Sequence, residues 1–203
     1  FYMNIGTKSL GLFGGTFDPI HDGHISVARE ALKTLNLDKV VFVPAGDPYM
    51  KTSSLNVSPA FHRMEMINRA LSYENDSNFC VSDIEIGRDG PSYTLETVET
   101  FNLPKDQLVV IIGADTLSSF HLWKEPEKIV SKARVAVIAR PGVDISSIVA
   151  DDNRGLLNNI EIIDSITPNI ASTQIRNTVK GGRNVEGISA PVRDYIHTHQ
   201  LYK

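Results

Sequence analysis

SLGLFGGTFDPIHDGH, residues 9–24, joins an apolar run to two glycines and then to two histidines. The apolar run, 9–13, predicts a buried strand. Gly14 and Gly15 follow it directly, and without a Cβ they let the backbone turn and approach a ligand closely. Pro19 lacks a backbone N–H and precedes a stretch of helical periodicity, so a helix is expected to begin a few residues after it. Because the first amides of a helix attract anions, the segment predicts a phosphate-binding loop.

Two histidines lie at the start of this helix. His21 and His24 are three residues apart, so one turn places them on one side, where ring N–H groups can donate to phosphate oxygens. Such a pair also occurs in metal sites and on ordinary surfaces. A structural zinc site is not expected, because zinc takes four ligands and Cys80 is the only cysteine. The glycines fit neither the Gly-x-Gly-x-x-Gly pattern nor the Walker pattern, which indicates a phosphate loop of another kind.

Short apolar runs alternate with amphipathic stretches along the whole chain. This order predicts an α/β fold, a Rossmann-like doubly wound parallel sheet with helices on both faces, in a single domain of residues 1–203. The expected strands are 9–13, 39–43, 78–84, 108–112, 134–139 and 159–163. The expected helices are 23–35, 58–71, 92–101, 125–132, 172–180 and 191–199, with Ser58, Ser92 and Ser172 as N-caps. Residues 140–155 are expected to form a surface loop, and ligands of such sheets bind outside the carboxyl ends of the strands.

Composition and charge limit which partners and which cellular location are expected for the chain. The chain has 203 residues with 41% hydrophobic content, enough to bury a core in one domain. A net charge of −4 argues against nucleic acid as a partner, which usually requires a basic surface. The apolar runs, such as 108–112, are far below the roughly 20 residues that cross a bilayer, so no membrane association and a cytoplasmic location are expected. Residues 1–7 are expected to be flexible or foreign to the natural chain, and an oligomeric state is not readable.

A second group of polar residues lies near the end of the chain. Ser172, Thr173 and Arg176 begin a helix that is expected to end at Gly181. Ser172 and Arg176 are four residues apart and share a helix face, so a hydroxyl, helix amides and a guanidinium could meet one phosphate group. The alternative is an ordinary capped helix with a solvated arginine.

Several segments together resemble one enzyme family. They are GGTFDPIHDGH (14–24), PAGDPYMK (44–51), SPAFHRM (58–64), SYTLET (92–97), IIGAD (111–115), Trp123 and IASTQIR (170–176). They are similar to motifs of the bacterial nicotinate-nucleotide adenylyltransferases, nucleotidyltransferases with a His-x-Gly-His motif. The resemblance covers nearly the whole chain, and it departs from the family pattern at Ala171, where a serine is usual, and at Pro48-Tyr49, where Pro-Pro is usual.

The resemblance implies two substrates, ATP and nicotinate mononucleotide, with Mg²⁺ bound through the ATP phosphates. It assigns nine residues to ATP, and among them His21, His24 and Arg176 would be catalytic: Gly14, Gly15, Thr16, Phe17, His21, His24, Ser172, Thr173 and Arg176. Four residues would bind nicotinate mononucleotide: Lys51, Thr94, Asp115 and Trp123. The alternatives are that Trp123 belongs to the core, that Thr94 caps a helix, that Asp115 only begins one, and that Lys51 is solvated.

The implied reaction is adenylyl transfer that yields deamido-NAD and pyrophosphate. Its nucleophile is a phosphate monoester with a second pKa of about 6, which is already mostly ionised at neutral pH. No strong general base is therefore expected, and His21 and His24 would stabilise developing charge instead. The alternatives are a related adenylyltransferase that accepts phosphopantetheine or nicotinamide mononucleotide, and a nucleotide sensor without turnover.

Overall fold

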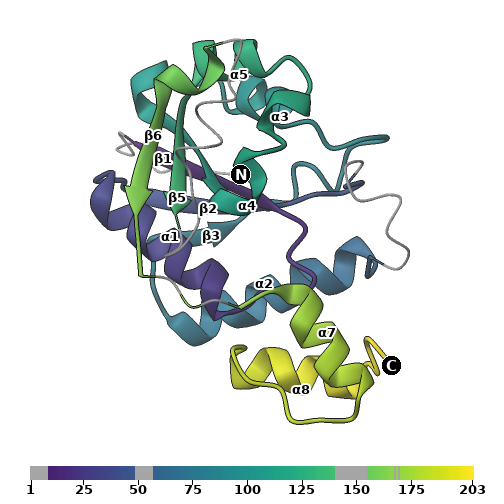
Figure 1. Cartoon of the computed structure of the whole chain (residues 1–203). Coiled ribbons are helices and arrows are strands. Elements are labelled where there is room, and N and C mark those ends of the chain that lie inside the picture. The colour runs from purple at the N-terminus through teal and green to yellow at the C-terminus, as the bar shows by residue number, and fades with distance from the viewer. Residues whose placement is uncertain (1–8, 49–56, 140–154, 167, 169) are drawn as a thin grey trace. The chain divides into compact units, whose positions relative to one another are not determined.

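The computed structural model describes residues 9–48, 57–139, 155–166, 168 and 170–203. Within these residues, six parallel strands form one sheet in the order β3-β2-β1-β4-β5-β6, which is the Rossmann order (Figure 1). The strands are β1 (Leu10–Gly15), β2 (Lys39–Pro44), β3 (Phe79–Val81), β4 (Leu108–Gly113), β5 (Arg134–Ala139) and β6 (Ile160–Asp164). The predicted α/β fold class with a parallel Rossmann-like sheet is confirmed.

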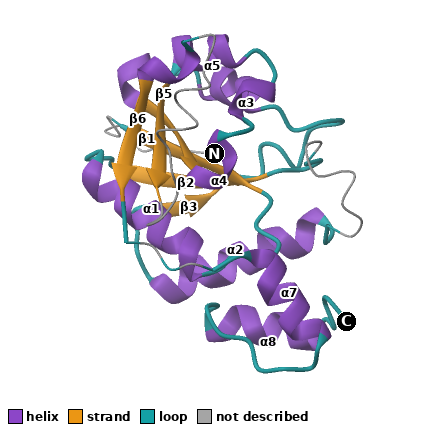
Figure 2. Cartoon of the chain, viewed as in Figure 1, coloured by secondary structure: helices purple, strands orange, loops and turns teal. Residues whose placement is uncertain are grey.

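The helices lie between and after these strands, as the colours of Figure 2 show. They are α1 (Asp22–Thr34), α2 (Ala60–Glu74), α3 (Thr94–Phe101), α4 (Ala114–Leu117), α5 (Pro126–Lys132), α7 (Ser172–Lys180) and α8 (Ala190–Thr198). Short 3-10 turns are also present at η2 (Lys105–Gln107), η3 (Phe120–Leu122) and η4 (Leu156–Asn159). Among the described residues, no helix has both the length and the apolar character that crossing a bilayer requires.

The chain separates into two compact units. The first is drawn from Phe1–Gly14, Val27–Val41 and Tyr93–Thr167, and the second from Gly15–Ser26, Phe42–Ser92 and Pro168–Lys203. The expectation of one domain for the whole chain stays a prediction.

The first unit is organised around β4. This strand pairs with β1 through Phe13 and Ile111 and with β5 through Ile111 and Ala136. Five of its six residues are buried, which is why it reads as an unbroken apolar run in the sequence. The strand order reverses between β1 and β4, and in open parallel sheets ligands bind outside the carboxyl ends of the strands at such a point.

The second unit contains α2 and α8, which pack against each other. His62 of α2 lies 2.8 Å from the hydroxyl of Tyr195 of α8, measured from Nδ1. The guanidinium of Arg69, also on α2, lies over the Tyr195 ring at 4.8 Å from its centroid. These contacts fix the last helix of the chain onto α2.

Most predicted strands match within one or two residues, and the span 134–139 matches in full. The strand predicted to end at Phe13 continues through both glycines, because the Gly15 carbonyl accepts the Ala45 N–H at 2.9 Å. The strand predicted over 78–84 is shorter. It ends at Val81, and the Gly87 N–H then donates to the Asp83 carbonyl in a turn.

All three predicted serine N-caps are wrong. Pro59, Tyr93 and Ala171 occupy the cap positions instead. Each serine makes a tertiary hydrogen bond: the Ser58 N–H donates to Asp18, the Ser92 hydroxyl accepts the Gly46 and Asp47 N–H groups, and the Ser172 hydroxyl donates to the Pro19 carbonyl. The predicted helix ends differ from the observed ends by at most three residues. The expected surface loop at 140–155 lies, except for Gly155, outside the described residues.

Candidate active site

The chain leaves β1 through a segment that we call the histidine loop, residues 15–24. Phe17 within it adopts a left-handed backbone with φ of 50°, which is uncommon for a residue with a side chain. Its ring is buried and lies 4.9 Å from the His24 ring and 5.6 Å from the Phe42 ring, between centroids. Gly15 permits this fold-back, because a Cβ there would lie 2.9 Å from the Phe17 ring. A Cβ on Gly14, by contrast, would meet no atom of the described residues within 4 Å.

His21 and His24 lie together at the start of α1, with stacked rings 3.7 Å apart between centroids. The His21 N–H donates to Nδ1 of His24 at 3.2 Å, and the His24 N–H donates to Nδ1 of His21 at 3.3 Å. Because each Nδ1 is an acceptor, the proton of each neutral ring belongs on Nε2. Gly23 keeps this arrangement possible, since a Cβ there would lie 3.0 Å from Nδ1 of His21. The backbone therefore sets both rings as Nε2–H donors.

The start of α7 joins the histidine loop across more than 150 residues of sequence. The Ser172 hydroxyl donates to the Pro19 carbonyl at 2.9 Å, and Nη1 of Arg176 donates to the Asp18 carbonyl at 2.7 Å. Nη2 of Arg176 also donates to the Thr173 hydroxyl at 3.2 Å. A guanidinium has five N–H donors, so these two bonds leave capacity for an anion. The two polar groups singled out in the sequence thus form one cluster in the second unit.

Asp18 is a buried residue of the histidine loop whose carboxylate holds the loop through two hydrogen bonds. Its side chain is 3% exposed, and Oδ2 accepts the Ser58 N–H at 3.1 Å. Oδ1 accepts the hydroxyl of Tyr202 at 2.6 Å. Burial, and then the negative charge of Asp18, raise the pKa of Tyr202, so its hydroxyl remains a donor at neutral pH. Sequence reasoning missed Tyr202, because nothing local to it indicates a partner so far away in the chain.

The residues expected to bind nicotinate mononucleotide are only in part within the described residues. Thr94 is the first residue of α3 and is half-buried. Tyr93 holds the cap position, which excludes the alternative that Thr94 is the cap. Asp115 is the second residue of α4, and its side chain lies outside the described part of the chain, as does all of Lys51.

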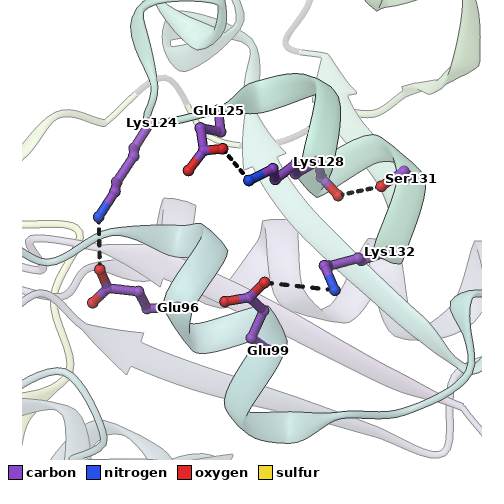
Figure 3. A network of polar contacts seen from close by, with 7 residues as sticks. All are labelled: Glu96, Glu99, Lys124, Glu125, Lys128, Ser131 and Lys132. Carbon is purple, nitrogen blue, oxygen red and sulfur yellow. Dashed lines mark hydrogen bonds and ion pairs between the residues drawn. The ribbon is translucent and has the colours of Figure 1, made fainter.

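Trp123 follows η3 in the first unit and is half-buried, which argues against a purely core role. Its ring meets the fully buried ring of Phe120 at 5.1 Å and 60°, in an edge-on contact. The next residue, Lys124, reaches Oε1 of Glu96 on α3 at 2.9 Å (Figure 3). Its ammonium group also lies over the Tyr93 ring, 4.1 Å from the centroid. Lys124 therefore ties the backbone beside Trp123 to the first turn of α3, where Thr94 lies.

Comparison with known proteins identifies relatives over the full length. Residues 12–178 match the cytidylyltransferase-like family. A protein of Neisseria meningitidis serogroup B named "Probable nicotinate-nucleotide adenylyltransferase" is 36% identical over 97% of this chain and 99% of its own length. A protein of the same name from Clostridium tetani is 34% identical over 97% of this chain and 100% of its own length.

A solved structure shares the fold. The nicotinic acid mononucleotide adenylyltransferase of Plasmodium falciparum, complexed with NaAD, aligns with a TM-score of 0.73 at 22% identity, over 96% of this chain and 97% of that chain. The resemblance seen in the sequence motifs is confirmed, and this chain belongs to the nicotinate-nucleotide adenylyltransferase family of cytidylyltransferase-like proteins.

Proposed function

We propose that this protein transfers the adenylyl group of ATP to nicotinate mononucleotide and releases deamido-NAD and pyrophosphate. Family membership supports this activity. The single structural observation that carries it is the union of the histidine loop with the start of α7, through Ser172 to Pro19 and Arg176 to Asp18. That union gathers hydroxyl, imidazole and guanidinium donors around one short backbone segment, which is the chemistry a polyphosphate needs.

We assign the ATP phosphates to this cluster. Backbone and side-chain donors come from the end of β1 and the histidine loop, through Gly14, Gly15, Thr16, Phe17, His21 and His24. The helix α7 adds Ser172, Thr173 and Arg176. The Nε2–H groups of the two histidines and the guanidinium carry the catalytic role, because they can donate to oxygens on which negative charge grows.

The reaction needs little proton transfer. An ionised phosphate oxygen of nicotinate mononucleotide attacks the α-phosphorus of ATP, and the bond from that phosphorus to the bridging oxygen breaks. The electron pair leaves with pyrophosphate, where the cationic and N–H donors stabilise it. Fixed donors act without reorganising during the step, so positioning and charge stabilisation supply the rate enhancement. The reciprocal bonds between His21 and His24 fit this role, since they engage both Nδ1 atoms as acceptors.

Mg²⁺ fits this proposal as a companion of ATP. The described residues contain no group of three or more His, Cys, Asp or Glu side chains arranged to hold a metal, and both oxygens of Asp18 accept hydrogen bonds. Magnesium keeps several waters and binds phosphate oxygens readily, so residues that hold the phosphates would hold it indirectly. When bound, it neutralises part of the phosphate charge. We also propose the cytoplasm as the compartment, because ATP is the substrate.

We assign nicotinate mononucleotide to Lys51, Thr94, Asp115 and Trp123. The half-buried Trp123 ring is the aromatic group that we assign to stacking on the pyridine ring. The N-terminal amides of α3 at Thr94 suit the nicotinate carboxylate. Lys51 would contact the phosphate and Asp115 a ribose hydroxyl.

A pyrophosphate-release assay tests the proposal. The wild-type protein is given ATP and Mg²⁺ with nicotinate mononucleotide, nicotinamide mononucleotide or phosphopantetheine in turn. We expect turnover with the nicotinate compound. No turnover of either pyridine nucleotide would refute the assignment, and turnover of phosphopantetheine alone would identify another adenylyltransferase. ATP binding without any turnover would identify a sensor.

A histidine variant tests the catalytic cluster in the same assay. His24→Ala should lose about 10²-fold in kcat, as removal of one charge-stabilising donor typically does. His197→Ala serves as the matched control, because His197 is an exposed histidine of α8. Wild-type kcat in His24→Ala would remove that residue from the proposed mechanism.

A further inference from the structure

Among the described residues, Arg63 of α2 has the largest side chain that is almost completely buried, with 1% exposed. Burial lowers the pKa of this guanidinium, and the charge of Asp18 opposes the shift. Arginine nevertheless keeps its proton in proteins. Burying a full charge is costly unless hydrogen bonds compensate for the lost water, so a buried arginine depends on the partners that its N–H groups find.

Its hydrogen bonds reach backbone carbonyls on three separate segments of the second unit. Nε donates to the Ser58 carbonyl at 2.9 Å, directly before α2. Nη1 donates to the Thr16 carbonyl at 2.9 Å, directly after β1. Nη2 donates to the Ala45 carbonyl at 2.6 Å and points at the Gly46 carbonyl at 3.3 Å, directly after β2. One planar fork thus joins the chain where β1 and β2 end, a geometry that a lysine point charge cannot reproduce.

In the segment after β2, both the carbonyl groups and the N–H groups are hydrogen-bonded to side chains. Arg63 binds its carbonyls, while the Ser92 hydroxyl accepts the Gly46 N–H at 2.8 Å and the Asp47 N–H at 3.1 Å. Gly46 also lies so close to Glu85 that an added Cβ would be 2.2 Å from the Glu85 carbonyl oxygen. The backbone at Gly46 is therefore closely packed and hydrogen-bonded on both its N–H and its carbonyl side, and Arg63 supplies the donors for the carbonyl side.

The bond to Thr16 reaches the histidine loop directly. The Thr16 carbonyl and the Phe17 N–H belong to one planar peptide group, so fixing the carbonyl oxygen fixes the direction of that N–H. The same bond holds the peptide that leads into the left-handed conformation of Phe17, which needs support from its surroundings. The positive charge of Arg63 also lies on the carbonyl side of this peptide, where it polarises the group and strengthens its N–H as a donor.

We propose that Arg63 is a positioning residue for adenylyl transfer, which sets the backbone of the histidine loop and of the segment after β2 in the geometry that the reacting phosphates require. It acts through Thr16, Ala45 and Gly46 and touches no substrate itself. The inference rests on the proposed function. It adds that the reaction requires one buried guanidinium to bind backbone carbonyls of three separate segments.

Three variants test the proposal by steady-state kinetics with ATP and nicotinate mononucleotide. Arg63→Lys keeps the charge but cannot bridge three segments, and we expect kcat to fall about 10²-fold, the usual result of a misplaced site. Arg63→Ala should fall further and should recover in part when guanidinium is added, whereas urea should not restore it. Arg69→Ala is the matched control, an arginine on the same helix whose Nε instead reaches Glu65 near the surface, and it should keep its kcat.

A second measurement separates positioning from general loss of stability. Every assay is run well below the melting temperature of the variant, and amide hydrogen exchange is compared over residues 14–26 and 44–48. Positioning predicts faster exchange in these two segments and unchanged exchange in β5. If Arg63→Ala does not fold, Arg63→Lys decides the outcome.

The outcomes distinguish this inference from the proposed function. A folded Arg63→Lys with wild-type kcat and wild-type exchange in both segments would overturn the role of Arg63. If the wild-type protein shows no turnover, the proposed function fails first. Exchange over 14–26 and the dissociation constant for ATP then still test Arg63, since both report on the loop without chemistry.

Discussion

Tyr202→Phe removes one hydroxyl from the anchor of the histidine loop and leaves the ring in place. The lost bond, 2.6 Å from the hydroxyl to Oδ1 of Asp18, is made to a carboxylate that is 3% exposed. Hydrogen bonds to buried charged groups contribute about 1.5–3 kcal/mol, so we expect a loss of about 2 kcal/mol in the free energy of unfolding. For a chain of this size that corresponds to a decrease of about 4–8 °C in melting temperature.

Urea unfolding with far-UV detection measures this loss. Tyr73→Phe is the matched control, because Tyr73 on α2 is 61% exposed and should cost nothing measurable. The slope of free energy against urea should be the same in both variants, which shows that the unfolded state is unchanged. A loss in Tyr202→Phe no larger than that in Tyr73→Phe would refute the anchoring role of the Tyr202 hydroxyl.

The same bond gives a pH signature. The pKa of Tyr202 is raised above its ordinary value of 10.0, first by burial and then by Asp18, so the folded state keeps a proton that the unfolded state releases. The folded state then binds more protons above pH 10.0, and stability falls as the pH rises beyond that value. Tyr202→Phe should show a shallower alkaline loss than the wild-type protein.

Three further substitutions probe other parts of the molecule. Trp123→Ala should raise the KM for nicotinate mononucleotide more than the KM for ATP, and equal changes would mean that the ring is only structural. Ser172→Ala loses the bond to the Pro19 carbonyl, so urea unfolding should show a decrease of about 1 kcal/mol, and wild-type stability would contradict the importance of that bond. Burial, and then the nearby His199, lower the pKa of His62 from 6.5, so the unfolded state binds more protons as the pH falls through 6.5 and stability decreases there. His62→Gln should flatten this acid side of the stability profile, and an unchanged profile would assign it to other groups.

The inner strands of the sheet were predictable from the sequence because they are buried on both faces. The run LVVIIG of β4 and the run RVAVIA of β5 are almost entirely buried, and continuous apolar runs of this length, in a chain of alternating elements, are typical of the inner strands of a parallel sheet. Strand ends were less certain. β1 continues through two glycines because its partner Ala45 supplies a ladder hydrogen bond, and that bond depends on pairing rather than on local preference.

The serines show why local rules failed at the helix starts. A serine before a helix is a good N-cap in isolation, since its hydroxyl can satisfy one open amide for about 1 kcal/mol. Ser92 and Ser172 instead meet backbone groups of distant segments, which need a partner inside the fold. A cap amide at the surface can be satisfied by water, whereas a buried backbone group cannot, so the tertiary bond prevails.

The candidate site divides in the same way. His21, His24, Ser172 and Arg176 were found in the sequence because the proposed ligand contacts depend on short, local spacings. The residues that hold this cluster in place act across 47 residues, for Arg63 to Thr16, and across 184 residues, for Tyr202 to Asp18. The Arg63 bond ends on a backbone carbonyl, which every residue has. The Tyr202 bond ends on an aspartate before a proline, which no sequence pattern marks as a buried acceptor. Such anchors leave no spacing pattern, and only the folded backbone shows that the histidine loop depends on them.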